Sequence, residues 1–177
     1  FVFGRMEDPD YALGVFRKHF EISSFGRRTG GFRALEIGPG DSLLSAVIAR
    51  SYGAERCDLI DAGDFAHAPL ANYLAMTAKL QADGRIGAPN LDGCQSVNDV
   101  LTRCQAKYWT QGLQSLAHIE SGSVDFIWSH TVLQHVRLAE FREYRRERRR
   151  VFRADGGSSH LFDIRDFMGG ALNHLRF

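Results

Sequence analysis

The sequence predicts an α/β fold, in which short apolar strands alternate with helices around a mostly parallel sheet. An apolar run over residues 32–37 ends in a glycine-rich turn, and a helical pattern follows at once. A second buried-strand pattern over 124–128 is followed by turn residues and an apolar stretch. Strand and helix patterns keep alternating along the rest of the chain, which is typical of parallel α/β sheets.

The composition is that of one folded domain. The 177 residues are 44% hydrophobic and 24% charged, which supports a core and argues against disorder. The formal net charge of +1 gives no strong attraction for nucleic acid or anionic membrane. No apolar run approaches the roughly 20 residues that span a bilayer, and no signal peptide is visible. We therefore expect a cytoplasmic protein without a membrane partner, for which nucleic acid is not the expected ligand.

The three cysteines predict no covalent or metal framework. Cys57, Cys94 and Cys104 are odd in number and irregularly spaced. This pattern fits neither a disulfide scaffold nor a paired zinc site. Reduced thiols are the expected state.

Residues 1–31 are expected to form a helical lead-in to the domain at 32–177. Asp8 or Asp10 can cap a helix, and a turn-rich stretch over 23–31 ends it. Two interpretations remain open for this helix. It forms a lid over a pocket, or it packs on the edge of the sheet.

The central motif is Glu36-Ile-Gly-Pro-Gly40, directly after the first strand. Glycines let a ligand approach the backbone, and the following helix offers free N–H groups. A second strand over 56–60 ends at Asp61, 23 residues after Gly38. An acidic residue at about this spacing accepts hydrogen bonds from ribose hydroxyls. The unit therefore predicts a nucleotide-type pocket.

The turn itself argues against a dinucleotide. The fingerprint G-x-G-x-x-G needs a third glycine where Leu43 stands. Pro39 stiffens the turn. Glu36 is poorly placed against a pyrophosphate and suits an ammonium group instead. Glu-x-Gly-x-Gly after an apolar strand resembles the first motif of class I S-adenosylmethionine-dependent methyltransferases.

This resemblance covers roughly residues 32–170. It implies a three-layer α/β/α Rossmann-like sandwich with sheet order 3-2-1-4-5, and S-adenosyl-L-methionine as the cofactor. Glu36, Gly38 and Gly40 would hold the amino-acid end of the cofactor, with Pro39 among its contacts. Asp61 would bind the ribose.

The middle of the chain is less regular. A helix is expected over 66–80, an insertion over about 83–107 and a weak third strand over 107–110. In the family that the chain resembles, the turn after this strand packs on the adenine ring. The matching residues are Gln111, Gly112 and Leu113. The usual acidic residue of that turn is missing.

The stretch over 122–136 is the second strong match. It resembles the fourth strand of the family, with an aspartate near the strand start and Ser129 at its end. A helix bearing Val132, Leu133 and Val136 is expected to follow. Because ligands bind beyond the carboxyl ends of parallel strands, Ser129 and His130 should face the sulfonium and the acceptor.

Two histidines are candidate general bases. Some O-methyltransferases of this family carry Glu-x-x-Glu-His here and use a metal, but Thr131 and Gln134 stand in place of both carboxylates. No metal site is therefore expected. His130 or His135 could take a proton from a hydroxyl, since the pKa of histidine lies near neutrality. The alternative for each is a hydrogen-bonded structural histidine.

The C-terminal part predicts an arginine-rich helix over 138–152 and a fifth strand over 159–164, separated by Asp155-Gly-Gly157. The charged face of the helix is expected to be solvated. Strands six and seven of the family are missing, so we expect a partial sequence. Otherwise a partner, such as a second copy, must cover the exposed edge of strand five.

The expected function is methyl transfer from S-adenosyl-L-methionine to a hydroxyl of a small molecule or sugar. The alternatives are a non-catalytic Rossmann-like binding module and a nicotinamide-dependent oxidoreductase. A nucleic-acid methyltransferase would use the arginine-rich helix, but the Pro-Pro-aromatic motif of the amino-methylating type is missing after 128.

Overall fold

The computed structural model describes residues 5–23, 31–85 and 87–163. Five strands form one sheet in the order β3-β2-β1-β4-β5, and each neighbouring pair is parallel. This confirms the predicted fold class and strand order. The strands are β1 (Phe32–Ile37), β2 (Ala54–Ile60), β3 (Ala106–Trp109), β4 (Val124–His130) and β5 (Phe152–Leu161).

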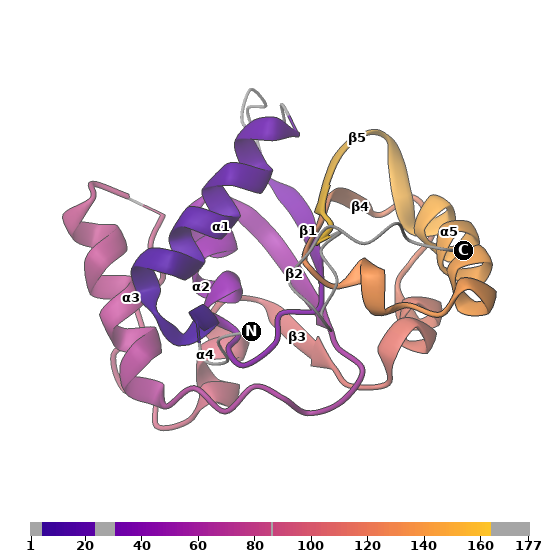
Figure 1. Ribbon diagram of the computed structural model, residues 1–177. Coiled ribbons are helices and arrows are strands. Elements are labelled where there is room, and N and C mark those ends of the chain that lie inside the picture. Colours follow the sequence, from indigo (N-terminus) through magenta and orange to yellow (C-terminus); the bar gives the residue numbers. More distant parts are fainter. Residues whose placement is uncertain (1–4, 24–30, 86, 164–177) are drawn as a thin grey trace.

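Helices cover both faces of the sheet (Figure 1). One face carries η1 (Arg5–Glu7), α1 (Pro9–Ile22), α2 (Leu44–Ser51), α3 (Leu70–Ala82) and α4 (Val97–Arg103). The other face carries η3 (Gly112–His118) and α5 (Leu138–Val151), and the short turn η4 (Leu133–His135) joins β4 to α5. Within the described ranges, every helix is too short or too polar to cross a membrane.

Side-chain alternation along β1 separates two cores. Ala34 packs in the larger core with α1, α2 and α3, whereas Leu35 and Ile37 pack in the smaller core under η3 and α5. In the larger core, Phe16 of α1 meets Trp128 edge-on, with ring centroids 5.3 Å apart. Phe16 is 1% exposed, so α1 is packed into this core. The predicted turn over 23–31 lies almost wholly outside the described residues.

A polar network links all five strands on the η3 side of the sheet. Arg33 of β1 donates from Nε and Nη2 to the fully buried carboxylate of Asp58 on β2, at 3.0 and 2.8 Å. Trp109 of β3 donates to the same carboxylate at 2.9 Å. The Arg33 backbone N–H donates to Asp125 of β4, which also pairs with Arg153 of β5 at 2.7 Å. The buried charges are thus each matched by hydrogen bonds.

The expected boundary between the last helix and strand is wrong. Asp155-Gly-Gly157 does not end the helix: α5 stops at Val151, and β5 begins at Phe152 without a loop. The register against β4 shifts between Val124 and Phe126, so the glycines lie inside an irregular strand. A Cβ on Gly156 would lie 2.6 Å from the Asp125 carbonyl oxygen. The glycine therefore permits a close strand approach rather than a helix stop.

The helix expected after β4 is also wrong. The chain forms only the three-residue turn η4. Thr131 adopts a left-handed φ of 57°, which is strained for a β-branched residue and interrupts any helix before it starts. Two other expected elements are present: α3 overlaps the helix expected over 66–80, and β3 overlaps the weak third strand expected over 107–110.

Candidate functional site

The turn after β1 is shaped by two glycines and tied to the end of β2. Gly38 and Gly40 have φ values of +74° and +75°, which favour glycine. Gly40 N donates to Asp61 Oδ2 at 2.9 Å. The Asp61 carbonyl accepts from Gly112 N at 2.7 Å. Asp61 therefore joins the turns that follow β1, β2 and β3.

A cavity of about 590 Å³ opens at these three turns. Ligand pockets usually measure roughly 300–1,000 Å³, so a nucleoside-sized molecule is within range. Four of the residues predicted to bind a cofactor line it: Gly38, Asp61, Gly112 and Leu113. Its remaining apolar lining comes from Ile37, Ile60, Ala62, Ala117, Val132 and Val136.

The far wall of the cavity is α5, whose charged face is solvated as the sequence predicts while its edge borders the cavity. Glu140, Glu143 and Glu147 lie one helical turn apart along this wall. Arg146 pairs with Glu143 at 3.3 Å and with Glu147 at 3.6 Å. Tyr144 is 2% exposed, and burial raises its pKa to about 12. The sequence signal for this wall is the series Glu140, Glu143 and Glu147, which recurs at helical spacing among the arginines.

Glu36 does not line the cavity. Its side chain is 1% exposed and turns into the larger core, where Trp128 Nε1 donates to Oε1 at 3.1 Å. Burial raises the pKa of Glu36 to about 7, opposed by hydrogen bonding from Ser45 and Trp128. Oε2 has no partner within ordinary hydrogen-bond geometry. An ammonium group can reach this oxygen only after the groups that cover it move.

Three other predicted cofactor contacts also lie outside the cavity lining. Pro39 and Gly40 belong to the turn but do not border the cavity. Ser129 is fully buried, and its hydroxyl is 2.8 Å from His160 Nδ1. The Ser129 hydroxyl therefore forms a hydrogen bond between β4 and β5.

Val132 covers the turn at Gly38. A Cβ added to Gly38 would lie 2.3 Å from Val132 Cγ2. The Val132 side chain therefore occupies the space that a side chain at position 38 would need. The preceding Thr131 is held in its left-handed conformation by hydrogen bonds from its N–H to Leu161 O and from its hydroxyl to His130 O, at 2.9 and 2.7 Å. The strained residue thus directs Val132 over the turn.

The two candidate bases lie in different places. His135 is exposed and borders the cavity. His130 is half-buried on the other face of the sheet, where its Nδ1 is 3.1 Å from His19 Nε2. Burial, with a contribution from Lys18, lowers the pKa of His130. His19 lies 111 residues away in sequence, and no local pattern predicted the contact.

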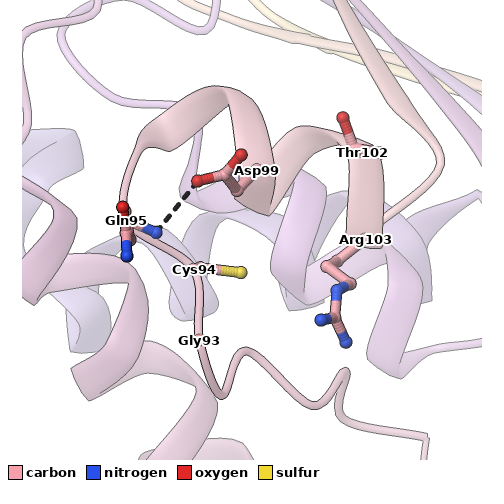
Figure 2. Close-up of a pocket in the computed structure, with 6 residues that line it drawn as sticks. All are labelled: Gly93, Cys94, Gln95, Asp99, Thr102 and Arg103. Carbon is pink, nitrogen blue, oxygen red and sulfur yellow. Dashed lines mark hydrogen bonds between the residues drawn. The ribbon is translucent and has the colours of Figure 1, made fainter.

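A second hollow, of about 380 Å³, lies beside α4 (Figure 2). Its one carboxylate, Asp99, accepts from the backbone N–H groups of Gln95 and Ser96, both at 2.9 Å. Asp99 is therefore occupied in a capping box at the start of α4. None of the predicted site residues borders this hollow.

The thiols are free, and burial raises the pKa of both Cys57 and Cys104, the latter to about 12. Cys57 and Cys104 are therefore not nucleophiles near neutral pH. Across the ranges that the structure describes, no three or more histidine, cysteine, aspartate or glutamate side chains gather in a metal-binding arrangement.

Comparison with known proteins gives structural likenesses only. No protein-family model and no curated protein matches the sequence. A provisionally assigned S-adenosyl-L-methionine-dependent methyltransferase from Methanococcus maripaludis matches at a TM-score of 0.44 and 14% identity. It covers 87% of this chain, which spans 63% of that protein.

Two structures of DhpI match as well. The complex with SAM and HEP has a TM-score of 0.42 and 16% identity, with 84% of this chain and 56% of that one covered. The SAH complex also has a TM-score of 0.42, at 14% identity, with 92% and 71% covered. The chain thus spans between 56% and 71% of the lengths of these neighbours.

Proposed function

We propose that the chain binds S-adenosyl-L-methionine and takes part in methyl transfer, as a class I methyltransferase domain. One observation carries the proposal. The cavity at the carboxyl ends of the strands is bordered by Gly38, Asp61, Gly112 and Leu113, which the sequence resemblance assigns to the cofactor. These residues come from three successive turns, so their convergence depends on the fold and not on proximity in sequence.

The residues present suit an adenosyl ligand. Asp61 offers carboxylate oxygens at the cavity for two ribose hydroxyls, and the remaining lone pairs serve this, since Oδ2 accepts from Gly40 N and Oδ1 from Ala62 N. Leu113 and Val132 offer apolar surface for a purine ring. The unsatisfied Oε2 of Glu36 is buried beside Trp128, two residues before the glycine turn in sequence, and suits an ammonium group once exposed.

The cofactor would supply an electrophilic methyl group on a sulfonium. The chain would contribute binding and orientation, which are worth several kcal/mol in displacement reactions. We propose a hydroxyl of a small molecule or sugar as the acceptor, with a histidine as proton acceptor. His135 has access to the cavity. His130 is the last residue of β4, but its ring lies beside His19 on the α1 face and does not border the cavity.

Two further expectations remain proposals. β5 is at one end of the described sheet, so a second copy of the chain is a candidate to cover it. A cytoplasmic location agrees with the free thiols.

A nicotinamide-dependent oxidoreductase is the rival enzyme. The position of its third fingerprint glycine is Leu43, which is 2% exposed and packs in the larger core. A non-catalytic binding module is the other rival, and it predicts that cofactor binds without methyl transfer.

Isothermal titration calorimetry with S-adenosylmethionine, S-adenosylhomocysteine and NAD⁺ separates these proposals. We expect the first two to bind and NAD⁺ not to bind. Tight NAD⁺ binding, with no binding of the sulfur ligands, would refute the proposal. A screen of hydroxyl acceptors with labelled methyl donor then separates an enzyme from a binding module.

The ribose assignment has its own test, Asp61→Asn. A hydrogen bond to a charged group is worth about 1.5–3 kcal/mol, so affinity for S-adenosylhomocysteine should fall by at least about tenfold. The exposed Asp64→Asn in the same loop is the matched control and should bind normally. Unchanged affinity in Asp61→Asn would show that the ribose lies elsewhere.

A further inference from the structure

The lining of the large cavity is negatively charged, although the formal net charge of the whole chain is +1. Among the described residues, four carboxylates and one guanidinium, that of Arg146, border this cavity. The carboxylates are those of Asp61, Glu140, Glu143 and Glu147. Charges of one sign that line a cleft raise the local concentration of the opposite charge. The cavity therefore favours a ligand that carries a positive group.

The arginines of α5 do not neutralise this lining, because most of them lie on other sides of the helix. Arg142, Arg145 and Arg149 are exposed, and none of them borders the cavity. Their spacing of three and four residues places them together on one face of a helix. Arg146 is the arginine of α5 that borders the cavity, so the helix presents mainly carboxylates there.

Glu140 differs from the other two glutamates of this wall in having no cation beside it. Glu143 pairs with Arg146 at 3.3 Å. Glu147 pairs with Arg150 at 2.8 Å. Within the ranges that the structure describes, no ion pair or hydrogen bond involves the Glu140 carboxylate. Its side chain is exposed at the cavity, so its charge is available to a ligand.

Tyr144 places a buried hydroxyl in the same wall, one helical turn from Glu140. Its side chain is 2% exposed, and the hydroxyl makes no hydrogen bond with the part of the chain that the structure describes. Burial raises its pKa to about 12, opposed by Arg148, so the phenol stays neutral near pH 7. Buried polar groups are nearly always hydrogen-bonded, so an unpartnered hydroxyl in a cavity wall indicates a polar ligand.

We propose that Glu140 and Tyr144 bind an ammonium group of the methyl acceptor, which is then an amino alcohol or an amino sugar. This inference rests on the methyl transfer proposed above. There the turns after β1, β2 and β3 hold the cofactor, which leaves α5, across the cavity, to a second molecule. The Glu140 carboxylate supplies the opposite charge, and the Tyr144 oxygen accepts an N–H of the ammonium group. His135 borders the same cavity, where the acceptor hydroxyl would lie.

Two small alcohols test the proposal in the ligand-free chain by nuclear magnetic resonance titration. 2-Aminoethanol carries an ammonium group at neutral pH, and ethane-1,2-diol has a hydroxyl in its place, so the two differ in charge at nearly equal size. At constant ionic strength, we expect 2-aminoethanol to shift the backbone amide signals of Glu140 and Tyr144 along a saturating curve. The diol should leave these signals unchanged. Equal shifts from both alcohols, or shifts from neither, would overturn the proposal.

Two variants of the wall separate binding from folding, with circular dichroism as the check that each folds. Glu140→Gln removes an exposed charge, so affinity for 2-aminoethanol should fall about two- to fivefold. Glu120→Gln, an exposed carboxylate outside the cavity lining, is the matched control and should bind as the wild type does. Unchanged affinity in Glu140→Gln would refute the charge pairing.

Tyr144→Phe keeps the ring and removes the unpartnered oxygen. Affinity for 2-aminoethanol should fall, while the thermal midpoint of the ligand-free chain stays the same or rises, because no hydrogen bond within the described chain is lost. A lower midpoint would show that the hydroxyl stabilises the fold, and would overturn its proposed role.

The same titration with saturating S-adenosylhomocysteine separates the acceptor from the cofactor. We expect 2-aminoethanol to bind beside it with similar affinity. Competition would place the ammonium group of the cofactor on this wall, and would overturn the assignment to the acceptor. Failure of S-adenosylhomocysteine itself to bind would overturn the proposed function, whereas the titration of the ligand-free chain would still decide whether Glu140 and Tyr144 recognise an ammonium group.

Discussion

Glu36→Gln should make the folded chain more stable in mildly alkaline solution. The carboxyl group of Glu36 is 1% exposed in the core, where Trp128 donates a hydrogen bond to it and Ser45 also lowers its pKa by hydrogen bonding. Glutamine keeps an oxygen that can accept this bond and removes the ionisation. The substitution thus isolates the free-energy cost of holding a charge in this place.

The magnitude follows from the pKa. Burial raises the pKa of Glu36 from 4.5 to about 7, so the unfolded chain ionises at lower pH than the folded chain. Stability from the neutral carboxyl is full below pH 4.5 and is lost as pH rises through 7. At about 1.4 kcal/mol per pKa unit, the total loss is about 3 kcal/mol. About 2 kcal/mol of it falls between about pH 5.5 and about pH 8.5.

Urea unfolding at these two pH values measures the effect as a difference between variant and wild type, which cancels the other titrating groups. The advantage of Glu36→Gln should grow by about 2 kcal/mol from the lower to the higher pH. The exposed Glu120→Gln is the control and should show no such growth. If the difference between Glu36→Gln and wild type is the same at both pH values, the carboxyl ionises normally and the argument fails.

Three other perturbations follow from the structure. Burial lowers the pKa of His19 and His160 from 6.5 to about 4. Their contribution to the free energy of unfolding should therefore be full above pH 6.5 and fall as pH drops towards 4. In urea unfolding, a His19→Gln variant should lose less stability over this pH range than the wild type. Gly38→Ala should cost at least about 1–2 kcal/mol for its left-handed φ, and more for the collision with Val132, which lowers the thermal midpoint. Asp58→Asn should cost about 3–5 kcal/mol in urea unfolding, since it leaves a buried guanidinium without its charge partner, and a wild-type midpoint would contradict this.

The first half of the fold could be predicted because its signals are local. The strand, glycine turn and helix at 32–51 follow one another with few intervening residues, and Asp61 ends the second strand at a spacing set by the unit itself. Parallel pairing and strand order then followed from the chirality of such units and from the family resemblance. Four of the eight predicted cofactor residues border one cavity for the same reason.

The remainder depended on contacts between distant segments. Glu36 turned out to face the larger core because alternation along β1 places it beside Trp128, which is 92 residues away. The helix expected after β4 failed at a single backbone angle, that of Thr131. The glycines of Asp155-Gly-Gly157 gave a turn signal that the approach of β4 overrode. The contact between His19 and His130 has no local pattern at all.

The polar network that joins the five strands has a consequence for how this scaffold can change. Arg33, Asp58, Asp125, Arg153 and Trp109 fix the strands relative to one another, and none of them borders the cavity. Alignment of the strands is thereby independent of the loops that border the cavity. Loops at the carboxyl ends, η4 among them, are therefore exchangeable parts: the cavity wall can be altered there while the charged network preserves the sheet.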